Sequence, residues 1–491
     1  MPARSRRRPT RHLPAEILLM IFSDFKIPDE TDPVDLPEKR DGISTLATLA
    51  RCSKWFYHIS TPLLYNTVYV HSASVCDALI RTLSRQLDLG RLTHRLKLCF
   101  SNHHGNDCYP NIVKSVIRNP RRKFILPPTL RQRILSSRKY LSADEQIALL
   151  LSLVPNLEDL LVSLPAVRGV IDIFEYIIHN ASSESHKPDI ASSGSSAIQL
   201  LSKGHFAKLQ TIRIYSNKIL PPSLHSRNLS EQLVPVILRL PQLTTFSIQG
   251  IKTSHGPLRL DNIPENLSLQ NLNLDSSWTD GQVLVDLISR CPRIRSLELI
   301  ISDKPWYRFW VPIPLQKVGN FLRNNLGDCL VALTIKDYAK GSSCTGIIGS
   351  LRKLENLRML WIPPKLLIGS GDSWDLDQWL PDSLEFVCFV STGTKWEDGV
   401  IRWLHNQVIY MIFMETRPNL TRVYVHWDIF RARPYMPVDY ARNIGRPGWN
   451  VAWLESELGL RKLVDPWPEM LEAHACTDES AFMEPRFISK E

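Results

Sequence analysis

A short motif of apolar and polar residues, x-Leu-x-x-Leu-x-Leu, recurs along most of the chain. In each copy the last apolar positions alternate with other residues, which predicts a short β-strand with one buried face. A degenerate copy lies near Leu96. The clearer copies are centred on Leu157, Leu209, Leu243, Leu269, Ile294, Leu330, Leu357, Leu384 and Leu420.

Most copies lie about 25 to 36 residues apart, a period typical of solenoid proteins. Helix-patterned runs precede several of them, such as "DGQVLVDLISRCP" and "VGNFLRNNLGDC". Each unit therefore predicts a helix, a turn and a strand. One unit cannot bury its apolar face alone, but stacked units can, with their strands in one parallel sheet along a curved inner wall. The pattern resembles the leucine-rich repeat, which implies an irregular α/β solenoid (horseshoe) over residues 146–430.

Two apolar stretches near the N-terminus have helical periodicity. "LPAEILLMIFSDF" places Ile17, Met20, Ile21 and Phe25 on one face, and "ISTLATLARCSKWFYHIS" forms a second such stretch. The segment Lys26–Gly42 between them is expected to be a solvent loop, and "TPLLY" to begin a last short segment. A unit this small leaves an apolar face that another chain or the adjoining solenoid must cover.

These N-terminal residues also resemble an F-box over about residues 12–66. The first half of the family pattern is matched by "LPAEI" and Ile21-Phe22, the second half by Cys52, Trp55 and Leu64-Tyr65. The resemblance implies a helical bundle that docks on the Skp-type adaptor of a cullin–RING ubiquitin ligase. The adaptor contacts that it implies are Leu13, Pro14, Ile17, Ile21, Cys52 and Trp55. The alternative is an ordinary helical cap on the solenoid.

The remaining ranges complete the predicted domain organisation. Residues 1–11 form a basic tail, expected to be disordered, and residues 67–145 form a linker with a degenerate first repeat and a basic insertion. Residues 431–491 form a C-terminal cap and tail.

The inner wall is the predicted substrate site, because its strand positions become large and apolar in the late repeats. The candidate substrate-binding residues are Met359, Trp361, Phe386, Arg422, Tyr424 and His426. Alternatively, the chain covers this wall itself, with Trp449, Trp453 and Trp467 in a C-terminal helix.

Composition narrows the class of protein. Hydrophobic residues make up 44% and charged residues 22%, as in folded proteins. No run of eighteen apolar residues and no signal-peptide pattern occur, so we expect an intracellular protein of the cytoplasm or nucleus, without a membrane partner. The nine cysteines are scattered singly, which favours reduced thiols over a disulfide framework.

The formal net charge is +10, and the segment Arg118–Tyr140 contains basic residues and no acidic ones. A solvated insertion is the simpler interpretation, a polyanion-binding patch the alternative, so nucleic acid is not the expected partner. The chain contains no phosphate loop, and "SNHHGNDCY" lacks the second ligand pair of a zinc site. We therefore expect no metal, no cofactor and no catalysis. The expected function is a ubiquitin-ligase substrate receptor; the alternative is a repeat scaffold without a ligase role.

Overall fold

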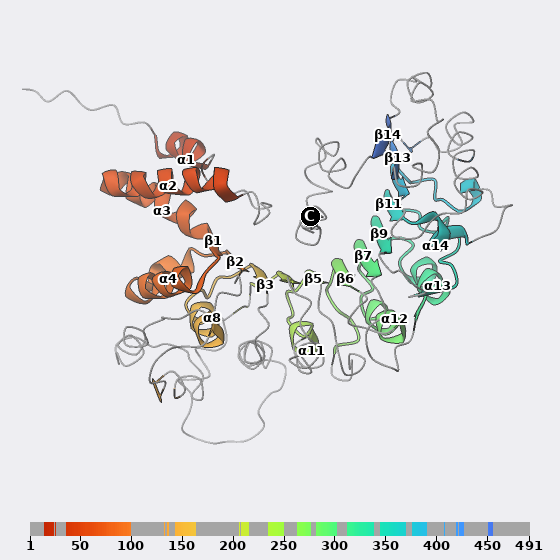
Figure 1. Cartoon of the computed structure of the whole chain (residues 1–491), viewed down its shortest axis with the longest axis horizontal. Helices are drawn as coiled ribbons and strands as arrows, with labels where there is room; N and C mark the ends of the chain where they lie inside the picture. The colour runs from red at the N-terminus through yellow and green to blue at the C-terminus, as the bar shows by residue number, and fades with distance from the viewer. Residues whose placement is uncertain are drawn as a thin grey trace, which may run out of the picture.

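The structure is a computed structural model, in which a group of N-terminal helices leads into a long curved sheet that follows an open arc (Figure 1). It describes residues 14–23, 25, 36–99, 132, 135–136, 143–163, 206, 208–215, 234–249, 263–275, 281–301, 312–337, 344–369, 376–389, 407, 419–420, 422–426 and 450–454.

The main sheet has twelve parallel strands that lie side by side in sequence order. They are β1 (Thr67–Val70), β2 (Arg95–Cys99), β3 (Asp159–Ser163), β4 (Thr211–Tyr215), β5 (Thr245–Gln249), β6 (Asn271–Asp275), β7 (Ser296–Ile301), β9 (Ala332–Asp337), β11 (Met359–Ile362), β12 (Phe386–Phe389), β13 (Arg422–His426) and β14 (Asn450–Leu454). The sheet is not closed into a barrel, because β1 and β14 form its two ends. A separate pair joins β8 (Ile313–Pro314) and β10 (Cys344–Thr345).

The alternation of the motif explains why these strands form. Leu272 and Leu274 of β6 are buried, whereas Asn271 and Asn273, which alternate with them along the strand, are only half-buried. The same apolar positions stack from strand to strand, for example Phe246 beside Leu272 and Leu272 beside Leu297. All ten motif copies, including the degenerate one near Leu96, contain a strand. The predicted parallel sheet is therefore confirmed.

Helices lie on the outer side of the arc and cover the apolar face of the sheet (Figure 1). They are α4 (Ala73–Arg85), α5 (Leu87–Arg91), α8 (Ala143–Ser152), α11 (Val234–Ile237), α12 (Gly281–Ser289), α13 (Leu315–Asn325), α14 (Pro364–Ile368) and the short 3-10 helix η6 (Leu376–Gln378). The two helix-patterned runs named above correspond to α12 and α13, as predicted. The apolar faces of the helices and the strand leucines that point toward these helices form one continuous core.

A repeated hydrogen-bond arrangement joins each turn to the next. Just before β11, the backbone N–H groups of Arg358 and Met359 both donate to the carbonyl of Val331, at 2.9 and 3.1 Å. Asn356 adds a side-chain bond, since its Nδ2 donates to the Asp328 carbonyl at 2.7 Å. The carbonyls that accept two such N–H groups belong to His94, Glu158, Gln210, Thr244, Gln270, Arg295, Val331 and Arg358. This ladder satisfies backbone groups that would otherwise be unpaired at the strand starts.

Several expectations need correction. The solvent loop expected over Lys26–Gly42 is wrong for its second half, because α2 (Leu36–Cys52) begins at Leu36. Pro37 does not prevent this, since proline is tolerated in the first turn of a helix. "TPLLY" continues α3 (Lys54–Asn66) without a break. Near the C-terminus, residues 450–454 form strand β14, which pairs with β13, and not the helix of the alternative interpretation.

The sheet also extends beyond the predicted array of residues 146–430. Strands β1 and β2 precede it, of which β2 is the predicted degenerate first repeat, and β14 follows it. Neither β1 nor β14 contains the leucine motif. Both join by parallel backbone pairing with a neighbouring strand, which requires no particular side chain.

Candidate functional site

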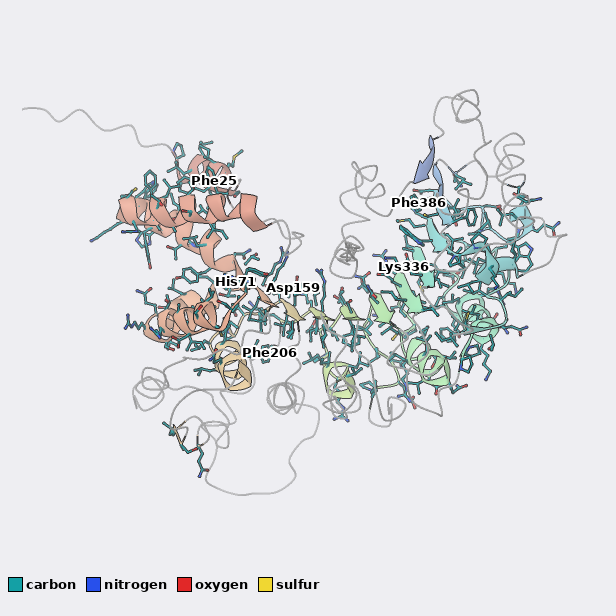
Figure 2. The ribbon with its side chains drawn as sticks, in the orientation of Figure 1. Phe25, His71, Asp159, Phe206, Lys336 and Phe386 are labelled. Atoms are coloured by element: carbon teal, nitrogen blue, oxygen red, sulfur yellow. The ribbon has the colours of Figure 1, made fainter. Side chains whose placement is uncertain are left out.

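The N-terminal helices α1 (Ala15–Ser23), α2 and α3 form a small unit with its own core. That core is separate from the core of the sheet. Within it, the ring of Phe22 packs against the ring of Phe56, with centroids 5.8 Å apart and planes tilted by 60°. Its buried residues are Leu18, Phe22, Leu46 and Ile59, and Phe25 packs against them (Figure 2).

Two local features position these helices. The Ser53 hydroxyl caps α3, because its Oγ accepts a bond from the Phe56 N–H at 3.1 Å. Gly42 lets α2 pass close to the end of α1, since a Cβ at this position would lie 2.7 Å from the Phe25 carbonyl oxygen. The unit is therefore a defined arrangement of three helices in which Leu18 and Phe22 point inward.

The opposite side of α1 is apolar and exposed. Ile17, Met20 and Ile21 have exposed fractions of 42, 69 and 45%. Trp55, at the start of α3, is 47% exposed, and Pro14 is exposed as well. Single exposed apolar residues are ordinary, but several on one short helix mark an interaction surface. We call Pro14, Ile17, Met20, Ile21 and Trp55 the N-terminal apolar surface.

The residues expected to contact an adaptor are thus largely accessible. Pro14, Ile17, Ile21 and Trp55 belong to the N-terminal apolar surface. Cys52 is exposed at the end of α2, and Leu13 lies outside the described residues. The sequence pattern did not separate these side chains from Leu18 and Phe22, because α1 is apolar around most of its circumference.

The residues expected on the inner wall fall into two rows of the sheet. Strand pairing aligns Met359, Phe386 and Arg422 in one row, and Trp361, Cys388 and Tyr424 in the next. His426 ends β13 opposite Leu454. Met359 and Phe386 are buried and Trp361 is half-buried. For Arg422, Tyr424 and His426 the structure describes the strand but not the side chains.

The middle of the inner wall contains a polar group that the sequence analysis did not identify. The Lys336 ammonium lies 3.2 Å from the Glu298 carboxylate, with side-chain exposures of only 9 and 4%. Lys336 also lies over the ring of Trp361, 5.4 Å from its centroid, and is labelled in Figure 2. Asn273 donates from Nδ2 to the other carboxylate oxygen of Glu298. Asn273, Glu298, Lys336 and Trp361 all occupy strand positions that alternate with the buried apolar ones. This alternation is the sequence signal that could have placed them on the inner wall.

Cys52, Cys76, Cys291 and Cys329 are free thiols. Burial raises the pKa of the Cys76 and Cys291 thiols to about 12, so both stay protonated at neutral pH. Cys52 is exposed. In the described ranges no three His, Cys, Asp or Glu side chains gather as metal ligands. His103, His104, Asp107 and Cys108 lie outside those ranges, as do the basic residues of Arg118–Tyr140.

No protein-family model matches the sequence, and no curated protein matches it significantly. Within the described part of the chain, no helix combines the length and apolarity that a membrane crossing needs.

Proposed function

We propose that this chain is the substrate-recognition subunit of a cullin–RING ubiquitin ligase. In this proposal the fold is an F-box helical bundle followed by an irregular leucine-rich-repeat horseshoe. The N-terminal apolar surface binds the Skp-type adaptor, and the inner wall of the sheet holds a protein substrate. The chain itself performs no catalysis; it acts by holding the substrate near a ubiquitin-charged partner.

The observation that carries the proposal is the division of apolar residues on α1. Leu18 and Phe22 are used in the unit's own core, whereas Ile17, Met20 and Ile21 are left exposed. A helical cap that only closed the sheet would bury such residues against it. An exposed apolar set, together with an exposed tryptophan on α3 of the same unit, has the composition of a protein-binding hot spot. It also coincides with the F-box sequence pattern at Pro14, Ile17, Ile21 and Trp55.

The arrangement of the sheet supports the second half of the proposal. Each repeat contributes one strand, the strands follow in sequence order, and the arc leaves one face of the sheet without a covering helix in the described ranges (Figure 1). Such curved sheets offer an extended surface to a partner.

The test is co-expression with the Skp-type adaptor, followed by size-exclusion chromatography. The wild-type chain should co-elute with the adaptor, and the double variant Ile17→Asp/Ile21→Asp should not, because charges on this surface cannot be desolvated. Leu87→Asp is the matched control: Leu87 lies on α5, outside the N-terminal unit, and is 43% exposed. It should co-elute like the wild type.

Circular dichroism of each variant establishes that the fold is retained. If the folded wild-type chain does not co-elute with the adaptor, the ligase role is excluded, and a repeat scaffold that binds proteins remains. Loss of co-elution in both the double variant and Leu87→Asp would also count against a specific adaptor surface.

A further inference from the structure

The inner wall contains buried polar atoms that no other part of the described chain satisfies. The Ser247 hydroxyl oxygen on β5, the Asn273 amide oxygen on β6 and the Trp361 indole nitrogen on β11 have no hydrogen-bond partner there. Ser247 is 5% exposed. A buried polar atom without a partner costs free energy, so each such atom calls for an explanation, and a bound group that supplies the partner is one.

These three atoms lie along one row of the sheet. Strand pairing places Ser247 beside Asn273, and Asn273 beside Glu298 on β7. Glu298 is followed in the same row by Thr334 on β9 and then by Trp361. The row therefore crosses the strands instead of running along one of them.

The length of the row indicates the size of the ligand. From β5 to β11 there are four steps between neighbouring strands, or about 19 Å at about 4.8 Å per step. A small molecule rarely reaches that far. An extended polypeptide covers the distance with about six residues at about 3.3 Å each.

The chemistry of the row also fits a polypeptide backbone. A tryptophan N–H can only donate, an amide oxygen only accepts, and a serine hydroxyl does both. Peptide N–H and C=O groups offer both partners at short intervals. Met359 lies two residues before Trp361 on β11, on the same face of the sheet, and pairs with Phe386 of β12. An apolar ligand side chain would contact the 8 and 7% of these residues that stay exposed.

The charge in the row excludes a strongly charged ligand. Glu298 and Lys336 neutralise each other at 3.2 Å and are both buried. A ligand charge placed there would compete with this pair and leave one of its members uncompensated. The partner should therefore be uncharged where it crosses β7 and β9.

We propose that the row Ser247, Asn273 and Trp361 binds an extended, uncharged polypeptide segment that crosses the strands and ends in an apolar side chain beside Met359 and Phe386. This inference deepens the proposed function, on which it rests, by naming the substrate class: proteins that present an unfolded or extended uncharged segment.

The test is selection of a display library of random nine-residue peptides on the purified full-length chain. Enriched peptides should lack charge in the middle and have an apolar residue at one end. Ser247→Ala and Trp361→Phe should each weaken binding of the best peptide by about three- to tenfold, the usual worth of one hydrogen bond. Trp361→Phe keeps an aromatic ring for Lys336.

Unfolding measurements separate a binding role from a structural one. Both substitutions remove a buried atom without a partner, so the free protein should be as stable as the wild type or more stable, while peptide binding weakens. Trp379→Phe is the matched control, because Trp379 packs against the main core instead of this row. It should leave peptide affinity unchanged.

Three outcomes would overturn the inference: enrichment of acidic or basic peptides, no enrichment, or peptide binding by Ser247→Ala and Trp361→Phe that is as tight as that of the wild type. The adaptor is absent from this experiment, so its failure is distinct from failure of the ligase role. Adaptor co-elution without peptide binding would remove the inference alone. Peptide binding without adaptor co-elution would remove the ligase role alone.

Discussion

Glu298 and Lys336 form an ion pair across two neighbouring strands of the sheet, with 3.2 Å between carboxylate oxygen and ammonium nitrogen. They lie 38 positions apart in the sequence and meet only because β7 pairs with β9. Asn273 binds the carboxylate from one side, and the Trp361 ring lies under the ammonium group on the other. Removing one member of such a buried ion pair costs several kcal/mol of folding free energy, about 3–5.

We therefore expect Glu298→Gln and Lys336→Met to destabilise the protein strongly when made singly. Each removes the opposite charge that lies 3.2 Å from a buried charged group, at a cost of about 3–5 kcal/mol. The double variant should lose much less than the sum of the two, because no uncompensated charge remains. Urea unfolding followed by circular dichroism measures these differences. Additive losses would show that the two groups do not interact.

Helix α13 contains a glycine that packing requires. A Cβ on Gly319 would lie 1.9 Å from the Ile348 carbonyl oxygen, which belongs to the next repeat. Gly319→Ala should therefore destabilise the protein by about 1–3 kcal/mol, although alanine is the better helix former. Asn324→Ala, at an exposed position of the same helix, should be neutral or slightly stabilising. Thermal unfolding distinguishes the two; equal effects would mean that α13 does not pack closely against the next repeat.

Asn356 joins successive turns through its side chain. Its Nδ2 donates to the Asp328 carbonyl at 2.7 Å, and Asn156 and Asn419 make the corresponding bonds to Arg91 and Asp382. Asn356→Ala should cost about 0.5–1.5 kcal/mol in the free energy of unfolding. Glu355→Ala, at the adjacent exposed position, is the control and should have little effect. An equal loss in both variants would argue against the bridging role.

The buried thiols predict how stability changes at alkaline pH. Cys76 and Cys291 have a pKa of about 12 in the folded chain, against about 8.5 in an unfolded one. Between these values the native state holds more protons than the unfolded state, so stability falls as pH rises, by up to about 1.4 kcal/mol per pH unit for each thiol. Below pH 8 this contribution is fully present. The Cys76→Ala/Cys291→Ala variant should lose stability less steeply between pH 9 and 11.

Thiol labelling at pH 8 gives an independent measurement on the same residues. Cys52 is exposed and should react in the folded protein, whereas Cys76 and Cys291 should react only after unfolding. Peptide mapping by mass spectrometry identifies the labelled positions. Rapid labelling of Cys76 in native protein would contradict its burial.

The positions of most strands were predictable from the sequence alone. Alternation of apolar and other residues is local, so copies such as "NLNLD" and "TFSIQ" predict both a strand and its buried face. The repetition of these copies further predicts one parallel sheet. Helices α12 and α13 were predictable for the same reason, since their apolar residues recur with a helical period.

Other features depended on contacts between distant residues, and only the tertiary structure decided them. Strands β1 and β14 contain no leucine motif and form because an edge strand offers them backbone partners. On α1, apolar residues surround the helix, so packing against Leu46 and Ile59 decided that Leu18 and Phe22 face inward and Ile17 and Ile21 outward. The polar row of the inner wall likewise arises from strand register, which brings Asn273, Glu298 and Trp361 together from three separate repeats.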